Sequence, residues 1–112
     1  MIDLIKGIDV SSWQSPAHIN WQALAKTHKY VIVRACYGKR NDGAFVDHIK
    51  HARDAGLVLG SYLYYRPGDS VQDQLDAFAS AVEPLIDATW LLPAVDFEQN
   101  TSNDGPVSSA RY

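Results

Sequence analysis

Strand-like and helix-like segments alternate along this chain, and the alternation restricts the fold more than any other feature of the sequence. Runs of β-branched and aromatic residues predict four strands, at residues 7–10, 30–35, 57–65 and 90–97. Apolar residues at helical spacing predict three helices between them, at residues 21–27, 45–56 and 71–82. Strands joined by helices pair in parallel, so the sequence predicts an α/β fold with a parallel sheet.

Capping residues mark the ends of these helices. Asn20 and Ser70 are predicted N-caps, because a side-chain oxygen at that position accepts a backbone N–H that the first turn leaves unpaired. Gly56 suits the left-handed position that follows a helix. The third helix is expected to bury one apolar face, made of Val71, Leu75, Phe78, Ala79 and Val82.

The same order of elements predicts half of a barrel. Right-handed crossovers place the helices on one side of the sheet, and four βα units are half of a TIM-like β/α barrel, which typically takes ~250 residues. The 112 residues are therefore expected to form one unit, 1–112, the N-terminal half of a barrel domain, with a further helix beginning at 108–112. Open sheet edges and an open inner face, built from residues such as Ile8, Ile32 and Val95, predict pairing with a second copy or a partly molten state.

Charge and cysteine content argue against several classes of function. A net charge of −3 and a pI near 5.7 disfavour nucleic acids and anionic membranes as partners, because these need a basic surface. The first residues, MIDLIKGIDV, hold no long apolar stretch. We therefore expect no secretory signal, no membrane span and a protein that is cytoplasmic until its release. Cys36 is the only cysteine, which excludes an intrachain disulfide and predicts a small buried side chain.

Carboxylates and aromatic side chains gather where the predicted strands end. In parallel β/α folds the reacting groups lie at the carboxyl ends of the strands. These ends carry Asp9 with Gln14 beyond it, Arg34, Tyr62 with Tyr64, and Asp96 with Glu98. Sugar rings stack on aromatic side chains and sugar hydroxyls bind acids, so the pattern is typical of a carbohydrate site.

Asp96 and Glu98 form a pair that suits acid catalysis. Side chains two apart on a strand point to the same side, with Cα atoms roughly 6.6 Å apart, while Phe97 between them turns toward the helices. Two like charges at this spacing disfavour joint ionisation, so one carboxyl is expected to stay protonated near neutral pH. We expect Glu98 to be the proton donor, with Asp96 and Asp9 as its carboxylate partners.

The shared side of the pair also restricts the mechanism. A direct nucleophile has to attack the sugar from the face opposite the acid, so Asp96 is better placed to orient an N-acetyl group that attacks the anomeric carbon. Asp9, on another strand, is the second candidate for stabilising the charged intermediate. Two alternatives remain open at this point. The chain could bind glycans without cleaving them, or the three acids could hold Mg²⁺ in a metal-dependent hydrolase.

The remaining aromatic and imidazole side chains predict structural roles. Trp13 and Trp90 are interpreted as packing residues rather than binding residues. At least one of the tyrosines at the end of the third strand has to face the helices as core. The histidines lack the spacing of metal ligands and receive no role; they are His18, His28, His48 and His51. No metal and no cofactor is predicted.

An ordered set of motifs resembles glycoside hydrolase family 25, the Ch-type lysozymes or N-acetylmuramidases. The opening motif is Gly7-Ile8-Asp9-Val10-Ser11 with Gln14 and Asn20-Trp21. The middle block is Asp47, Ala52, Ala55-Gly56 and Gly60-Ser61-Tyr62-Leu63-Tyr64. The last motif is Leu92-Pro93-Ala94-Val95-Asp96-Phe97-Glu98. No single motif is specific for the family. The order and spacing of the motifs from residue 7 to residue 99 are specific for it.

This resemblance implies a modified β/α barrel that cleaves the β-1,4 bond between N-acetylmuramic acid and N-acetylglucosamine in peptidoglycan, as phage and bacterial lysins do. By position, Glu98 is similar to the family's general acid/base, Asp96 to the neighbour that orients the N-acetyl group, and Asp9 to the strand-one acid. Tyr62 is similar to an aromatic residue that contacts substrate. Tyr64 stands where the family commonly has Phe. The family's later strands supply a further active-site aspartate, which nothing here matches.

Overall fold

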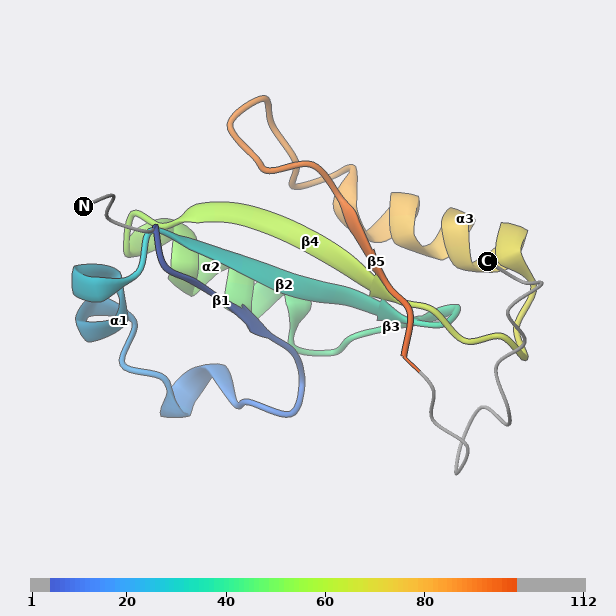
Figure 1. The fold of residues 1–112 in the computed structure, drawn as a ribbon, viewed down its shortest axis with the longest axis horizontal. Helices are drawn as coiled ribbons and strands as arrows, with labels where there is room; N and C mark the ends of the chain where they lie inside the picture. Colours follow the sequence, from blue (N-terminus) through green and yellow to red (C-terminus); the bar gives the residue numbers. More distant parts are fainter. Residues whose placement is uncertain (1–4, 99–112) are drawn as a thin grey trace.

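The fold is built on one mainly parallel sheet. The computed structural model describes residues 5–98, in which strands β1 (Gly7–Val10), β2 (Tyr30–Tyr37), β4 (Val58–Tyr64) and β5 (Ala94–Asp96) lie side by side in that order. All neighbours in this order pair in parallel, and their carboxyl ends point the same way (Figure 1). The predicted α/β fold with a parallel sheet is confirmed. The described residues form an open sheet and not a closed barrel.

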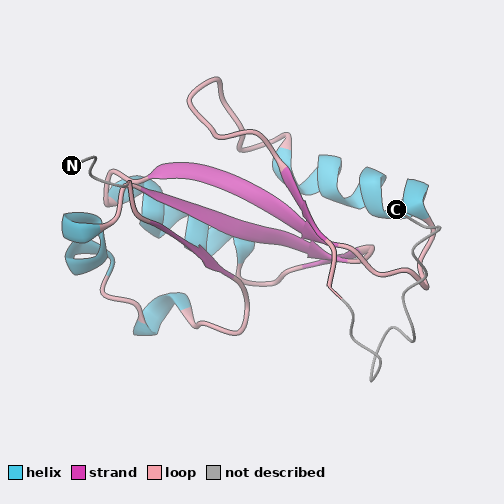
Figure 2. Cartoon of the chain, viewed as in Figure 1, coloured by secondary structure: helices cyan, strands magenta, loops and turns pink. Residues whose placement is uncertain are grey.

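The helices begin and end where the capping residues predict. They are α1 (Trp21–Thr27), α2 (Phe45–Asp54) and α3 (Val71–Val82), and a short 3₁₀ helix, η1 (Pro16–His18), precedes α1 (Figure 2). Asn20 accepts a hydrogen bond from the Ala23 N–H, and Ser70 accepts one from the Asp73 N–H. Gly56, which follows α2, has a φ of 84°, the left-handed conformation that glycine adopts without steric cost.

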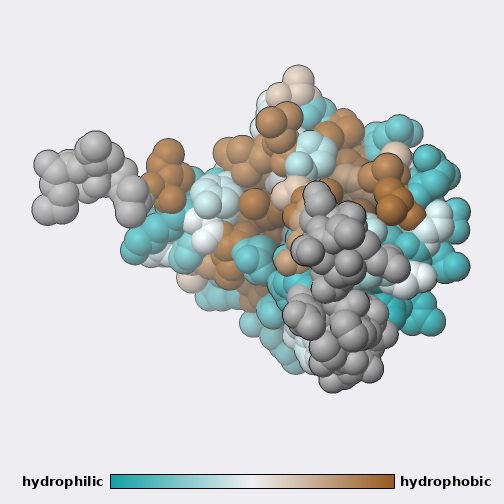
Figure 3. All heavy atoms as spheres, turned by 45° about the vertical axis from the view of Figure 1, so that its right-hand side comes forward, coloured by the Kyte–Doolittle hydropathy of each residue, from teal (hydrophilic) through white to brown (hydrophobic). Residues whose placement is uncertain are grey.

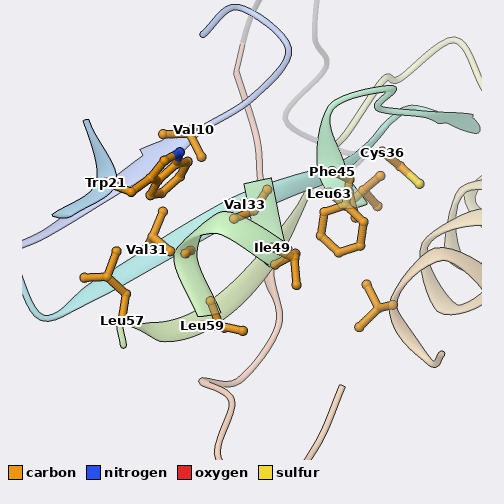
Figure 4. Packing of buried hydrophobic residues seen from close by; sticks show 13 residues of the cluster. Val10, Trp21, Val31, Val33, Cys36, Phe45, Ile49, Leu57, Leu59 and Leu63 are labelled. Carbon is orange, nitrogen blue, oxygen red and sulfur yellow. The ribbon is translucent and has the colours of Figure 1, made fainter. Parts of the chain in front are cut away.

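The three helices pack on one side of the sheet, as right-handed crossovers require. α2 lies behind β2 and β4 in Figure 1, and α3 contacts β2 and β4 as well. α1 joins them through Trp21, whose ring stacks on His51 and meets His48 edge-on. Buried side chains from the sheet and from α1, α2 and α3 fill the space between them (Figure 4). Cys36 belongs to this core and is fully buried, as predicted.

The strand that carries the acidic pair is shorter than predicted. β5 covers three residues instead of the predicted 90–97. Pro93 has no N–H to donate to a strand ladder. Two residues earlier, the Leu91 N–H donates one hydrogen bond to the Leu59 carbonyl of β4. Leu92 is 90% exposed. The apolar run before Asp96 therefore meets the sheet through one bond at Leu91 and becomes a strand only from Ala94.

The second and third strands also differ from the prediction at their ends. β2 continues to Tyr37, two residues beyond the predicted end, and shifts register between Arg34 and Cys36. A two-residue strand, β3 (Arg40–Asn41), folds back antiparallel on β2 where a loop was expected. β4 is one residue shorter at each end than the predicted strand. The tight turn between β2 and β3 is possible because Gly38 adopts a φ of 60°, which glycine reaches without steric cost.

Helix α3 is rotated relative to the predicted apolar face. Its fully buried residues are Gln74 and Val82, whereas Val71 and Leu75 are 55% and 47% exposed. The Gln74 amide accepts a bond from the Arg66 N–H and donates bonds to the Arg66 and Asp69 carbonyls. A polar residue with three backbone bonds thus takes a core position that periodicity assigned to apolar neighbours.

The face of the sheet opposite the helices is uncovered within residues 5–98. The expectation that Ile8 lies on this face is wrong, because Ile8 packs against the helix-side core. Ile32 does lie on it and lines a hollow of about 520 Å³ at the amino ends of the strands, with Ile5, Tyr30, Val58 and Leu91. Figure 3 shows apolar residues gathered on the surface between hydrophilic ones. No helix among the described residues is long and apolar enough to span a membrane.

Candidate functional site

One pocket lies at the carboxyl ends of the strands and holds the acidic residues that the sequence singles out. It encloses about 300 Å³ and is lined by Asp9, Ile32, Tyr62, Ala94, Val95, Asp96 and Glu98. Asp9 comes from β1, Tyr62 from β4, and Asp96 from the last residue of β5. Three strands thus contribute one polar side chain each to the same wall, and Glu98 adds a fourth from just beyond β5.

Strand register explains why these side chains meet. Asp9 is opposite Ile32 in β2, and Tyr62 is opposite Ala94 in β5. Because side chains alternate along a strand, residues 94 and 96 share a face of the sheet with residue 62. Phe97 lies past the end of β5, where its ring is 5.2 Å from the Tyr65 ring and half-exposed. That Phe97 faces the helices stays a prediction.

The environment of Asp96 favours its protonated form. Burial, a hydrogen bond with Glu98, and the negative charges of Glu98 and Asp9 raise the pKa of Asp96 to about 6. The direction agrees with the argument that two acids so close disfavour joint ionisation. The carboxyl of Asp96 therefore holds a proton in mildly acidic solution.

Tyr62 lines the same pocket as a neutral hydrogen-bonding group. Burial raises the pKa of its hydroxyl to about 12; the Arg34 guanidinium acts in the opposite direction, and the charges of Asp9 and Asp96 add to the rise. The phenol therefore keeps its proton at any physiological pH. It can donate a hydrogen bond to a ligand and offer its ring face to an apolar surface.

Three residues predicted to bind substrate do not line this pocket. The Gln14 amide oxygen accepts the Ser11 N–H within the loop after β1. Arg34 is buried in an ion pair, and Tyr64 is buried with its ring stacked 4.7 Å from the Tyr37 ring. All three are engaged within the protein, so their role in binding stays a prediction that the geometry does not support.

Asp42 is a buried residue of the site's framework that the sequence did not indicate. Its Oδ2 accepts bonds from the Arg34 Nε at 2.8 Å and from the Ser12 N–H at 2.9 Å, and its Oδ1 accepts one from the Ala44 N–H. Arg34 also donates to the Ser12 hydroxyl. The network ties the loop after β1 to β2 and to the start of α2. The sequence Asn41-Asp42-Gly43 indicates a turn, but nothing in it shows the carboxylate reaching Arg34.

His48 is the second such residue. It is fully buried in α2, and its Nε2 lies 2.8 Å from the Ser11 carbonyl oxygen. The geometry requires Nε2 to carry the hydrogen and donate it. A histidine that received no role from the sequence therefore fixes the start of the loop after Asp9.

The two tryptophans that were interpreted as packing residues differ. Trp90 is partly buried against the core. Trp13 is 83% exposed, so its interpretation as a packing residue is wrong. It sits in a turn whose hydrogen bonds use backbone groups and polar side chains, which leaves the indole outside the core.

The magnesium alternative gains no geometric support. Among the described residues, no three His, Cys, Asp or Glu side chains are grouped closely enough to hold a metal ion.

Comparisons with known proteins point to one family of glycosidases. The family model of glycosyl hydrolases family 25 matches residues 8–111. Lysozyme M1 of Streptomyces globisporus is 33% identical over 102 residues, which cover 88% of this chain and 34% of that protein. The uncharacterized protein YegX of Escherichia coli K12 is 33% identical over 86 residues, covering 70% of this chain and 31% of the relative.

Solved structures agree in fold. The bacterial lysozyme from Streptomyces coelicolor superposes with a TM-score of 0.76 at 32% identity, covering 88% of this chain and 46% of that one. The muramidase from Trichobolus zukalii gives a TM-score of 0.80 at 26% identity, covering 96% and 53%. The chain thus spans about a third of the curated relatives that it matches and about half of these solved structures.

Proposed function

Because this chain belongs to the glycosyl hydrolases family 25, we propose that it carries the acidic site of a lysozyme-type glycosidase. The substrate is the β-1,4 bond between N-acetylmuramic acid and N-acetylglucosamine in peptidoglycan, and the site of action is the cell wall. The lysozymes and muramidases among its relatives support this choice. The parallel sheet is proposed to be the first half of the wall of a β/α barrel.

The observation that carries the proposal is the meeting of Asp9, Asp96 and Glu98 in one pocket beside Tyr62. Glycosidases use carboxyl groups both to protonate the leaving oxygen and to stabilise positive charge at the anomeric carbon. An aromatic ring next to these acids provides a surface for the apolar face of a sugar. The pocket combines both requirements at the strand ends, where β/α enzymes hold their active sites.

Within this site Glu98 is the proton donor. It extends past the end of β5 and is exposed to the pocket, so it can reach a glycosidic oxygen. Asp96 shares a hydrogen bond with it, and the pKa of Asp96 is raised to about 6, which supports a proton held beside Glu98 in mildly acidic solution. Proton donation from the pair to the leaving oxygen is the step that general acid catalysis needs.

Asp96 and Asp9 act on charge and orientation. Asp96 lies on the same side as Glu98, so it is poorly placed for attack from the opposite face of the sugar. We assign it to orienting the substrate N-acetyl group, whose carbonyl oxygen attacks the anomeric carbon. Asp9, on β1, faces the same pocket and stabilises the positive charge that develops there.

Replacement of Glu98 by Gln tests this assignment. Glu98→Gln removes the transferable proton and keeps the size of the side chain, so peptidoglycan cleavage should fall at least ~10²-fold. Release of soluble wall fragments measures the rate, and a thermal unfolding curve shows that the fold is kept. A Glu98→Gln protein that cleaves at the wild-type rate would exclude Glu98 as the acid.

A glycan-binding protein without turnover is the second candidate function. The uncovered inner face of the sheet favours it, because within residues 5–98 the pocket has walls from one side only. This candidate predicts that the chain sediments with insoluble peptidoglycan and releases no new reducing ends. Cleavage that depends on Glu98 would reject it.

A further inference from the structure

The loop after β1 presents an exposed indole beside the acidic pocket. Trp13 is 83% exposed, although tryptophan is highly buried on average in folded proteins. It follows Asp9 by four positions, so the two Cα atoms are at most about 14 Å apart. The loop leaves the carboxyl end of β1, the end of the sheet at which β5 also stops (Figure 1). Trp13 therefore lies within reach of a glycan that extends beyond the pocket.

The turn that carries Trp13 is held by its own polar groups. The Trp13 N–H donates to the Ser11 hydroxyl at 3.1 Å, and the Gln14 N–H donates to the Ser11 carbonyl at 3.1 Å. The Gln14 side chain in turn accepts the Ser11 N–H at 2.9 Å. These bonds fix the backbone on both sides of the indole without using the indole itself.

Buried residues then anchor this turn to the rest of the fold. Asp42, whose side chain is fully buried, accepts the Ser12 N–H at 2.9 Å, and Arg34 donates to the Ser12 hydroxyl at 2.9 Å. From α2, His48 bonds to the Ser11 carbonyl. The backbone of this anchored turn loses little conformational freedom when a ligand binds to its exposed side chain, and this favours affinity.

The surroundings of Trp13 are polar, and this selects the kind of ligand. Ser12, Gln14 and Ser15 are all exposed around it. A protein-docking surface has an apolar core with a polar rim, whereas a single aromatic ring among hydroxyl and amide groups matches a sugar. The apolar C–H face of a pyranose packs on the electron-rich face of an indole, while its hydroxyls bond to the polar neighbours.

We propose that Trp13 is a sugar-stacking platform that binds peptidoglycan glycan outside the cleavage pocket. The inference rests on the proposed function for the nature of the ligand. It adds a second binding position on the β1 side of the pocket, which holds a longer glycan in register with the acids. Its effect falls on binding and not on the chemical step.

Fluorescence quenching tests the contact directly. The chain has three tryptophans, of which Trp21 is buried and Trp90 is partly buried, so acrylamide quenches mainly Trp13. Oligosaccharides of alternating N-acetylglucosamine and N-acetylmuramic acid, added to the Glu98→Gln protein to prevent cleavage, should protect this fluorescence saturably. The protection should be lost in the double variant with Trp13→Phe. Unchanged quenching at a glycan concentration that calorimetry shows to be saturating would overturn the proposal.

Affinity gives the second readout. In the same Glu98→Gln background, Trp13→Ala should weaken oligosaccharide binding about 3- to 10-fold, and Trp13→Tyr should restore most of it, because stacking needs an aromatic face. Val46→Ala is the matched control, since Val46 is an exposed apolar residue on α2, and it should leave binding unchanged. Equal affinity of the Trp13→Ala and parent proteins would sink this inference alone. Absence of any glycan binding by the parent protein would sink the proposed function and this inference with it.

Discussion

The raised pKa of Asp96 links the charge of the site to the stability of the fold. Its carboxyl has an ordinary pKa of 3.8, and burial together with Glu98 and Asp9 raises that pKa to about 6 in the folded chain. Between these two values the folded chain holds a proton that the unfolded chain has released. The resulting contribution to stability is therefore complete below about pH 4 and is lost as the pH rises through 6.

Asp96→Asn should remove this loss. The full difference between the two pKa values would correspond to about 3 kcal/mol, but Asp96 is partly exposed, and solvent screening reduces the expected effect to about 1 kcal/mol. The variant should therefore gain about 1 kcal/mol in free energy of unfolding relative to wild type when the pH is raised from 4 to 7. Urea unfolding of both proteins at the two pH values measures it. A difference that is the same at both values would contradict the electrostatic account.

For single residues, strand alternation predicted which side chains share the pocket. Contacts with residues far away in the sequence could not be predicted. Asp9, Tyr62, Asp96 and Glu98 lie in one pocket, as their positions at strand ends indicate, while their catalytic roles stay predictions. The fate of Arg34 could not be predicted, because its partner Asp42 reaches it through a two-residue strand that has no clear propensity signal. The exposure of Trp13 could not be predicted either, because it depends on how one turn is anchored.

Among the helices and strands, the features that depend on nearby residues agree with the prediction, and those that depend on distant residues differ from it. Caps act within three residues, so Asn20 and Ser70 mark helix starts correctly. The length of β5 depends on a partner strand far away in sequence, and Pro93 leaves the preceding run without a continuous ladder. Likewise, periodicity assigned the buried face of α3 from apolar residues alone and missed Gln74, whose burial depends on the turn at residues 66–69.

Gln74→Ala tests the role of that buried amide in fixing α3. The change removes the bond from the Arg66 N–H and the two bonds to the Arg66 and Asp69 carbonyls, so the free energy of unfolding should fall by about 3 kcal/mol. Gln72→Ala is the matched control on the same helix. Gln72 bonds only to Asp76 among the residues described, on the exposed face, and its loss should cost about 0.5 kcal/mol or less. Equal losses in the two variants would show that the buried bonds do not hold the helix.

For the whole molecule, we expect the open sheet face and the outer strands to govern association with a second copy. β1 and β5 form the two edges of the sheet within the described residues, and edge strands offer unpaired N–H and C=O groups to a second chain. The apolar hollow at Ile5, Val58 and Leu91 adds surface that a soluble monomer rarely leaves open. A two-fold pairing that sets β5 of one copy beside β1 of another would cover both features.

Light scattering at micromolar concentration checks this expectation. The 112-residue chain should have the mass of a dimer or larger assembly, or it should be monomeric and unfold without cooperativity. The reason is that, within residues 5–98, one face of the parallel sheet has no opposing layer of side chains. A compact monomer with a sharp thermal transition would show that the sheet is stable without a covering layer.

Analysis of the cleavage products is the direct test of the proposed lysozyme-type activity, because it identifies the glycosidic bond that the site breaks. Purified peptidoglycan is incubated with the protein, its new reducing ends are labelled by borohydride reduction, and the labelled sugar is identified by mass spectrometry, with Glu98→Gln as the control. The account predicts new reducing ends on N-acetylmuramic acid from the wild-type protein and none from Glu98→Gln. New reducing ends on N-acetylglucosamine, or equal release by both proteins, would contradict it.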